Sequence, residues 1–254
     1  MAKMDQSRKR NAERVAEQLP IRQDMVTLLV YLRDNRITGT QSLGNLPLKA
    51  IREVTSEFVN PPVLDTDIGG RVYKLRSEDE IWPLVFLHAI AEVGELLLGG
   101  RSRRLRLTPR GDEFLAVTSL AQVRYMFVTW WTRVNWLIAY SFIGMGDGLP
   151  KYFGHDTLTN LLSLKVDSWV NFETFADDLI KETGLRWMSE DTTYHRRSLH
   201  GAVKKMVINI LIDFGAANGV YRENPILGAP YKDLVSFKIT DFGRDLLKMV
   251  ASLS

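Results

Sequence analysis

Five arginines lie in the stretch 101–110 and form the densest concentration of positive charge in the sequence. They are Arg101, Arg103, Arg104, Arg106 and Arg110. A guanidinium group is always charged and can donate two parallel hydrogen bonds to a phosphate or a carboxylate. The stretch therefore predicts contact either with phosphate groups or with an acidic protein surface.

A second basic group lies on a predicted helix over 194–214. Its members are Arg196, Arg197, His200 and Lys204, with Lys205 beside them. Helical geometry places the first four on an arc of about 100°. No Asp or Glu occurs from 194 to 212. A basic arc near the amino-terminal end of a helix is typical of a helix that enters a DNA groove. A solvated basic face is the alternative.

Acidic residues provide a third candidate site. Asp65 and Asp67 form an Asp-x-Asp pair, and the Gly-Asp-Gly loop around Asp147 follows later. The pair resembles the nucleophile motif of the haloacid dehalogenase superfamily, and the loop resembles its metal-binding loop. The resemblance implies a Mg²⁺-dependent phosphohydrolase. That chemistry needs the nucleophile at the end of a buried parallel strand, and the Pro-rich segment 61–64 is too short to be one.

Other catalytic patterns are incomplete. The spacing of Gly39 and Gly44 is that of a phosphate-binding loop, but Asn45 stands where the lysine is required. His195 and His200 are five residues apart, so they do not share a helix face as a metal-binding pair would. No Ser–His–Asp arrangement can be assembled from the sequence. We therefore predict no catalytic residues, no metal site and no cofactor.

The arginine-rich stretch runs into a strand and a helix. Leu105 and Leu107 alternate with arginines, which is the pattern of a half-buried strand. Thr108 then suits a helix N-cap, and Pro109 suits the first helical turn. A Gly-Gly turn and a possible partner strand over 95–98 come before it. The segment therefore predicts a hairpin followed by a capped helix.

The same pattern occurs again near the carboxyl end, over 237–247. The matched pairs are Leu105 with Phe237, Arg106 with Lys238, Leu107 with Ile239, Thr108 with Thr240, Gly111 with Gly243 and Leu115 with Leu247. Upstream, 91–94 matches 212–215, which aligns Gly94 with Gly215. Two matching blocks in the same order indicate an internal duplication.

A helix, a short strand, a basic turn, a strand and a Thr-capped helix resemble the wing region of winged-helix domains in prokaryotic regulators. Winged-helix proteins mostly bind DNA, and a large minority bind protein instead. In the first copy, the helix over 81–93 is apolar nearly all round, so the arginine-rich wing is the expected contact. In the second copy, the helix over 194–214 carries the basic arc.

The composition limits the class of protein. The chain has 254 residues, of which 45% are hydrophobic and 25% charged, as in an ordinary globular protein. The net charge of +3 permits an anionic partner without requiring one. The absence of cysteine excludes disulfides, thiol catalysis and thiolate metal sites, and it favours a cytoplasmic location. The first eighteen residues contain no apolar segment typical of a secretory signal.

We therefore expect a mainly α chain with small β-hairpins, built from tandem winged-helix-like units joined by an aromatic helix. The predicted parts are a basic tail over 1–20, a first unit over 21–120, an aromatic helix and Gly-rich loop over 121–150, and a second unit over 151–254. The aromatic helix, from Ala121 to Ile143, is expected to pack between the halves or against a second subunit. A membrane span is not expected, because Arg133 would lie near the bilayer centre.

Three functions follow in order of preference. The first is non-catalytic, regulatory DNA binding through the arginines and the basic helix. The second is a protein–protein adaptor, in which the wings and the aromatic helix build a larger assembly. The third is the phosphohydrolase with Asp65, Asp67 and Asp147.

Overall fold

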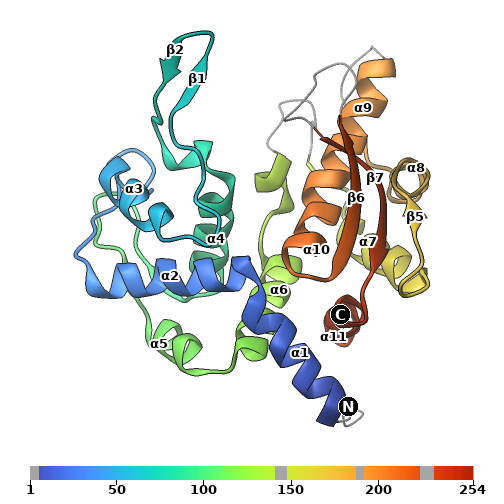
Figure 1. Ribbon diagram of the computed structural model, residues 1–254, viewed down its shortest axis with the longest axis horizontal. Helices are drawn as coiled ribbons and strands as arrows, with labels where there is room; N and C mark the ends of the chain where they lie inside the picture. Colours follow the sequence, from blue (N-terminus) through green and yellow to red (C-terminus); the bar gives the residue numbers. More distant parts are fainter. Residues whose placement is uncertain (1–5, 141–147, 187–191, 224–231, 254) are drawn as a thin grey trace. The chain divides into compact units, whose positions relative to one another are not determined.

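The computed structural model describes residues 6–140, 148–186, 192–223 and 232–253 (Figure 1). The chain is mainly helical with short antiparallel strand pairs, so the predicted α+β class is confirmed. It divides into two compact units, residues 1–134 (unit 1) and 135–254 (unit 2). Among the described residues, no helix has the length and apolar character needed to cross a bilayer.

Unit 1 is a group of helices with two separate two-stranded sheets. Its helices are α1 (Gln6–Gln18), α2 (Pro20–Asp34), α3 (Leu48–Ser56), the 3₁₀ turn η1 (Glu78–Glu80), α4 (Trp82–Val93), α5 (Pro109–Ala116) and α6 (Ser119–Arg133). The sheets pair β1 (Thr66–Ile68) with β2 (Arg71–Tyr73) and β3 (Leu97–Leu98) with β4 (Arg106–Leu107). Trp130, Phe86, Phe127 and Met25 are among its largest fully buried side chains.

Helix α1 covers residues 6–18 of the predicted basic tail, and it packs as part of unit 1. Ala12 and Ala16 are one helical turn apart and both are buried where α1 packs against α6. The Glu13 carboxylate accepts a hydrogen bond from the Leu120 backbone N–H at 3.2 Å. Small side chains on one face let α1 approach closely, while its basic side chains remain exposed.

The prediction of one continuous helix from Ala121 to Ile143 is wrong. Helix α6 ends at Arg133, and Val134 is extended. The Asn135 side chain then accepts a hydrogen bond from the Leu137 N–H at 3.1 Å, which begins the 3₁₀ turn η2 (Trp136–Tyr140). A side-chain oxygen that binds a nearby backbone N–H competes with continued helix. Residues 141–143 lie outside the described part of the chain.

The tryptophans of this segment belong to two different cores. Trp130 is fully buried in unit 1, where its ring centroid lies 4.8 Å from that of Phe86. Trp136 is buried in unit 2 against Phe153, at 5.7 Å. Trp131 is half-buried. The aromatic residues therefore supply interior packing within each unit instead of one joining helix.

Unit 2 is built around a three-stranded antiparallel sheet in the order β5–β7–β6. Its strands are β5 (Val170–Asn171), β6 (Ala217–Glu223) and β7 (Lys232–Ile239). Its further helices are α7 (Phe153–Ser163), α8 (Phe172–Thr183), α9 (Thr192–Val203), the π-helical segment η4 (Lys204–Ile208), α10 (Asn209–Asp213) and α11 (Asp241–Ala251). The predicted helix over 194–214 is thus present, with a π-helical segment inside it.

One local arrangement recurs in both units, at the junction of helix, hairpin and capped helix. In unit 1, Thr108 accepts a hydrogen bond from the Gly111 N–H at 3.0 Å, and its hydroxyl donates to the Glu95 carbonyl at 2.6 Å. The Thr108 N–H donates to the Leu96 carbonyl at 3.0 Å. The threonine therefore caps α5 and ties that helix to the end of α4.

In unit 2, Thr240 makes the same three bonds. It accepts from Gly243 at 2.9 Å and donates from its hydroxyl to the Gly215 carbonyl at 2.9 Å. Its N–H donates to the Ala216 carbonyl at 3.1 Å. These partners equate Gly215 with Glu95, and the two residues have φ angles of 65° and 59°. The upstream sequence match, which paired Gly215 with Gly94, is therefore displaced by one residue.

We expect Trp130→Ala to lower the free energy of unfolding by about 3–5 kcal/mol, because the indole is fully buried. Trp131→Ala should cost clearly less, since that side chain is half-buried. Urea unfolding followed by circular dichroism measures both. Equal losses for the two variants would contradict the placement of Trp130 in the core.

A second prediction tests the recurring junction. An added Cβ at Gly243 would lie 1.9 Å from the Ala216 carbonyl oxygen, so Gly243→Ala should cost at least about 1–3 kcal/mol. Gly154→Ala on α7 is the matched control, because its Cβ would lie 4.0 Å from the nearest atoms, those of the Trp136 ring. The control should be neutral or stabilising by up to about 1 kcal/mol. Similar stability of the two variants in urea would show that the close approach is not a constraint.

Candidate nucleic-acid interface

The arginine-rich stretch forms the turn between β3 and β4. Leu97 pairs with Leu107 and Leu98 with Arg106. The turn over 99–104 is closed by a hydrogen bond from the Arg103 N–H to the Gly100 carbonyl at 3.0 Å. Leu105 is fully buried and anchors the turn in the core. The strand pattern predicted for 105–107 is therefore present.

A loop before α3 supports this turn through backbone contacts. The Leu105 N–H donates to the Ile37 carbonyl at 2.8 Å, and the Gly39 N–H donates to the Arg103 carbonyl at 2.9 Å. A Cβ on Gly39 would lie 2.5 Å from the Gly100 carbonyl oxygen. Gly44 also packs against Gly100. Gly39 and Gly44 thus allow the backbone of their loop to contact the backbone at Gly100. This packing role accounts for the Gly39–Gly44 spacing, which is also that of a phosphate-binding loop.

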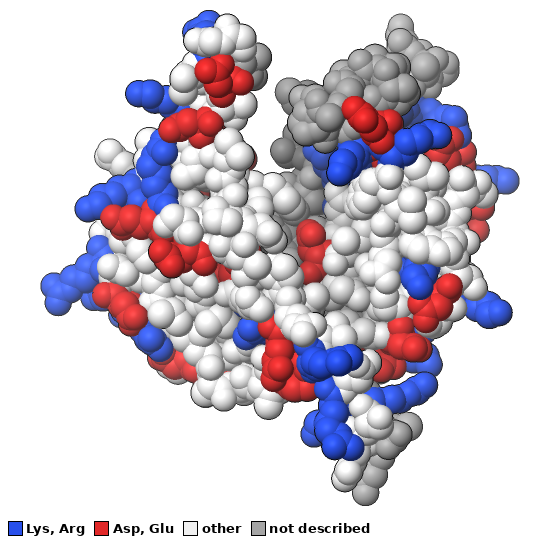
Figure 2. Space-filling model, viewed as in Figure 1, with Lys and Arg blue, Asp and Glu red and all other residues white. Residues whose placement is uncertain are grey.

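Four of the five predicted arginines present free guanidinium groups. They are Arg101, Arg103, Arg104 and Arg106, and all four are exposed. Within the described residues, none of the four makes an ion pair or a side-chain hydrogen bond. Figure 2 shows basic side chains projecting from the part of unit 1 on the left of the view. Arg110 is different, because it pairs with Glu95 at 2.6 Å.

The structure adds Arg36 to this group. Thr38 forms an antiparallel bridge with Arg104, which places them on the same side of the small sheet. Residues two apart in an extended chain share a face, so Arg36 and Arg106 lie on that side too. Arg36 is exposed and has no ion pair within the described residues. The alternation of Arg36, Ile37 and Thr38 was the only sequence signal for this extra strand.

The basic arc of unit 2 is largely occupied by contacts of its own. Arg196 on α9 binds the Asp177 carboxylate of α8 through two hydrogen bonds, at 2.8 and 3.1 Å. His200 lies with Nε2 2.7 Å from Asp177 Oδ1. The hydrogen bonds from Arg196, followed by that from His200, lower the pKa of Asp177 to about 2. The sequence showed no acid on α9, but the acid comes from the neighbouring helix.

Only part of the arc remains available to a ligand. The Lys204 ammonium donates to the Lys232 carbonyl at 2.9 Å, and burial lowers its pKa. Arg197 is exposed and has no ion pair within the described residues. Lys205 is also exposed, with its ammonium 5.4 Å from the Tyr140 ring centroid. Arg197 and Lys205 are therefore the accessible cations of this helix.

Asp65 and Asp67, the Asp-x-Asp pair, make hydrogen bonds at the β1–β2 hairpin. Asp65 binds Arg52 at 2.8 Å, and Asp67 accepts the Gly70 N–H at 2.8 Å. Both residues lie at an exposed antiparallel hairpin. A phosphohydrolase nucleophile would instead need to lie at the end of a buried parallel strand. Asp147 lies outside the described residues. No cluster of three metal-binding side chains occurs in the described part of the chain.

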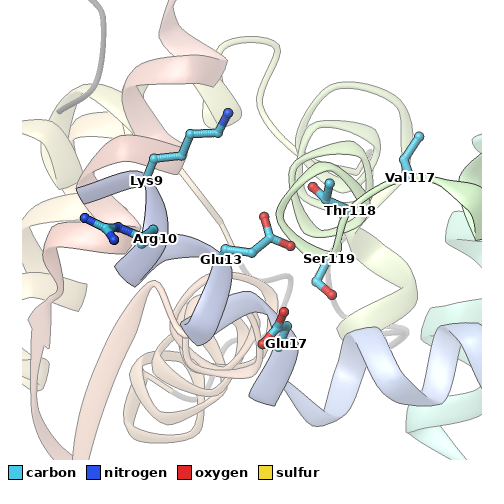
Figure 3. A pocket seen from close by; sticks show the side chains of 7 residues that line it. All are labelled: Lys9, Arg10, Glu13, Glu17, Val117, Thr118 and Ser119. Atoms are coloured by element: carbon cyan, nitrogen blue, oxygen red, sulfur yellow. The ribbon is translucent and has the colours of Figure 1, made fainter. Parts of the chain in front are cut away.

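A groove between α1 and the start of α6 is lined by mixed charges (Figure 3). The lining side chains are Lys9, Arg10, Glu13, Glu17, Val117, Thr118 and Ser119. Glu13 already accepts an N–H from the first turn of α6. Two acids and two bases give the groove no preference for an anion or a cation.

Comparison with family models, with curated proteins and with solved structures finds no match for this chain.

One buried ion pair lies beneath the unit 1 surface. Glu78 and His88 are both buried, with His88 Nδ1 2.6 Å from Glu78 Oε1. The other Glu78 oxygen accepts the Leu46 N–H at 2.6 Å. Burial opposes the charge on His88, but the bond to Glu78 and the nearby Glu92 carboxylate outweigh it and raise its pKa. The pair joins the start of α3 to α4.

We expect the pKa of His88 in the folded protein to lie well above the ordinary value of 6.5, so that the imidazole remains protonated at neutral pH. A raised folded-state pKa means that the stabilisation is complete below pH 6.5 and is lost as the pH rises through the raised value. Histidine NMR resonances measure this. A His88 resonance that titrates near the ordinary value of 6.5 would contradict the assignment.

Proposed function

We propose that this chain is a non-catalytic, regulatory DNA-binding protein that contacts the phosphate backbone through the turn between β3 and β4. The observation that carries the proposal is the set of exposed guanidinium groups without acidic partners among the described residues, at Arg101, Arg103, Arg104 and Arg106. The turn is held by backbone hydrogen bonds to 37–40, so the charges sit on a supported element. Preorganised arginines suit binding to phosphates.

We further propose that the two units are tandem winged-helix-like units that arose by duplication. The support is the order of helix, strand, strand and Thr-capped helix in both units, together with the repeated bonds of Thr108 and Thr240. In each unit a short preceding strand also pairs with the second hairpin strand, at Thr38 in unit 1 and in β5 in unit 2.

Unit 1 carries the main DNA contact in this proposal. In its helix α4 only Pro83 and Glu92 are exposed, and Glu92 faces His88, so that helix is a poor base reader. In unit 2, Arg196 and His200 are held by Asp177, which leaves Arg197 and Lys205 as supporting contacts. Binding through backbone contacts alone carries little sequence information.

A protein–protein adaptor is the second candidate, and it has its own observation. Leu98 is 52% exposed directly opposite Arg106, and Leu43 is 57% exposed in the supporting loop. Exposed leucines beside arginines fit an acidic, partly apolar protein surface. Leucine side chains would make no favourable contact with the phosphate groups of DNA.

Binding to a fluorescent duplex across a salt series tests the proposal. The affinity should fall with salt, by a slope of about −0.9 for each phosphate contacted. The triple variant Arg103→Ala, Arg104→Ala, Arg106→Ala should reduce the slope by up to about 2.7, the sum for three contacts. It should weaken binding to every sequence alike.

The matched control removes the same charge elsewhere. Lys9, Arg10 and Arg14 are exposed on α1, so their replacement by Ala should leave the slope nearly unchanged. Equal effects of the two triple variants would point to net charge instead of a defined interface. Absence of binding to duplex and single-stranded DNA at about 50 mM salt would overturn the DNA proposal in favour of the adaptor.

A further inference from the structure

The hairpin β1–β2 of unit 1 has no partner for either of its outer edges within the described residues. Figure 1 shows it projecting from the body of unit 1. The strands pair from Thr66 with Tyr73 to Ile68 with Arg71, around a two-residue Gly-Gly turn. Every described side chain of the strands and turn is exposed, with Val72 at 55% and Tyr73 at 49%. An isolated two-stranded hairpin is marginally stable in water.

The base of this hairpin is nevertheless held in place. The Asp65 carboxylate accepts hydrogen bonds from Arg52 at 2.8 and 3.2 Å and from the Leu75 N–H at 3.1 Å. Leu75 is buried. Asp67 closes the tip by accepting the Gly70 N–H. The hairpin is therefore clamped at both ends while its edges stay open, which is the form expected of an element that pairs with something else.

The strand register decides which backbone groups are free. A two-residue turn makes Ile68 and Arg71 the hydrogen-bonded closing pair, and such pairs alternate along the ladder. The N–H and C=O groups of Val72 therefore point away from β1. Those of Asp67 point away from β2 on the opposite edge. Each edge thus offers a central residue for pairing with another strand.

Charge distinguishes the two edges. Pairing of β1 with its own copy would place Asp67 opposite Asp67, and like charges in that position are destabilising. Pairing of β2 with its own copy about Val72 places Val72 opposite Val72 and Arg71 opposite Tyr73. Arg71 already lies over its own Tyr73 ring at 5.2 Å, so this contact repeats across the pair.

We propose that β2 pairs antiparallel with β2 of a second copy of this chain, on a two-fold axis through Val72, to form a four-stranded sheet. The stretch 65–74 contains two acids and two bases, so its charge sums to zero and gives it no attraction for a polyanion. The exposed Val72 and Tyr73 become covered in the pair. The contact is small compared with a standard stable interface, so the dimer is concentration-dependent.

Light scattering of the full chain over increasing concentration is the first test. The mass should rise from 29.0 kDa toward twice that value and no further. Val72→Pro should abolish the increase, because it removes the outward N–H without touching the β1–β2 ladder. Asp67→Asn on the other edge keeps a side-chain oxygen that can accept the Gly70 N–H, and this control should leave the dimer intact.

A second test does not depend on tolerance of proline. The chain has no cysteine, so a single introduced thiol reports only its own contacts. Val72→Cys should give a disulfide-linked dimer under mild oxidation, since paired residues on a two-fold axis are within bridging distance. Thr66→Cys, exposed on the same hairpin and with Asp67 left in place, should give several-fold less, because the two Thr66 residues lie on the outer strands of the four-stranded sheet.

Four results would overturn the proposal. They are a monomer at the highest concentration, a dimer that survives Val72→Pro, equal cross-linking of the two cysteine variants, and assemblies larger than a dimer. The last would indicate β1 paired with β2 of the next copy, which propagates without closing. None of these results bears on duplex binding by the arginine turn, so the two proposals fail independently.

Discussion

The close approach of one helix start to the end of another underlies both units. At this junction a threonine satisfies a helix N-terminus and two carbonyl groups at once, and a glycine three residues later lets the backbone come near. In unit 2 the partners are Thr240, Gly243 and Ala216, and the Cβ that any other residue would add has no room. The hairpin of unit 2 begins and ends at this junction, so Ala217 pairs with Ile239 at its base, and the register shifts further along, between Val220 and Tyr221.

The two units use their positive charge differently. In unit 1 the arginines stand on a turn whose neighbours are backbone and leucine, so the charge remains unpaired within the described residues. In unit 2 the helix α8 brings Asp177 against Arg196 and His200, so much of the charge is satisfied internally. A guanidinium that already binds a carboxylate must break that contact before it can bind a phosphate. The arginines of the unit 1 turn have no such contact to break among the described residues.

Carboxylates in this chain mainly position backbone and cations. Asp65 and Asp67 hold the two ends of the β1–β2 hairpin, while Glu78 joins the N–H of Leu46 to the ring of His88. Each of these groups accepts at least one hydrogen bond from a donor in its own unit. They therefore help to fix the geometry of the surfaces around them.

Local chemistry in the sequence determined the helix caps and the hairpin ends. Thr108 and Thr240 cap helices as predicted, because a side-chain oxygen reaches an N–H only three residues away. The end of α6 at Arg133 and the packing of α1 were not predictable from periodicity, since they depend on contacts of Asn135 and of Ala16 formed in the folded chain. Likewise, the sequence determined that α9 is basic, but only the tertiary structure decided that Asp177 of α8 lies against it. Charge pairing depends on distance in space, and a one-dimensional pattern records only distance along the chain.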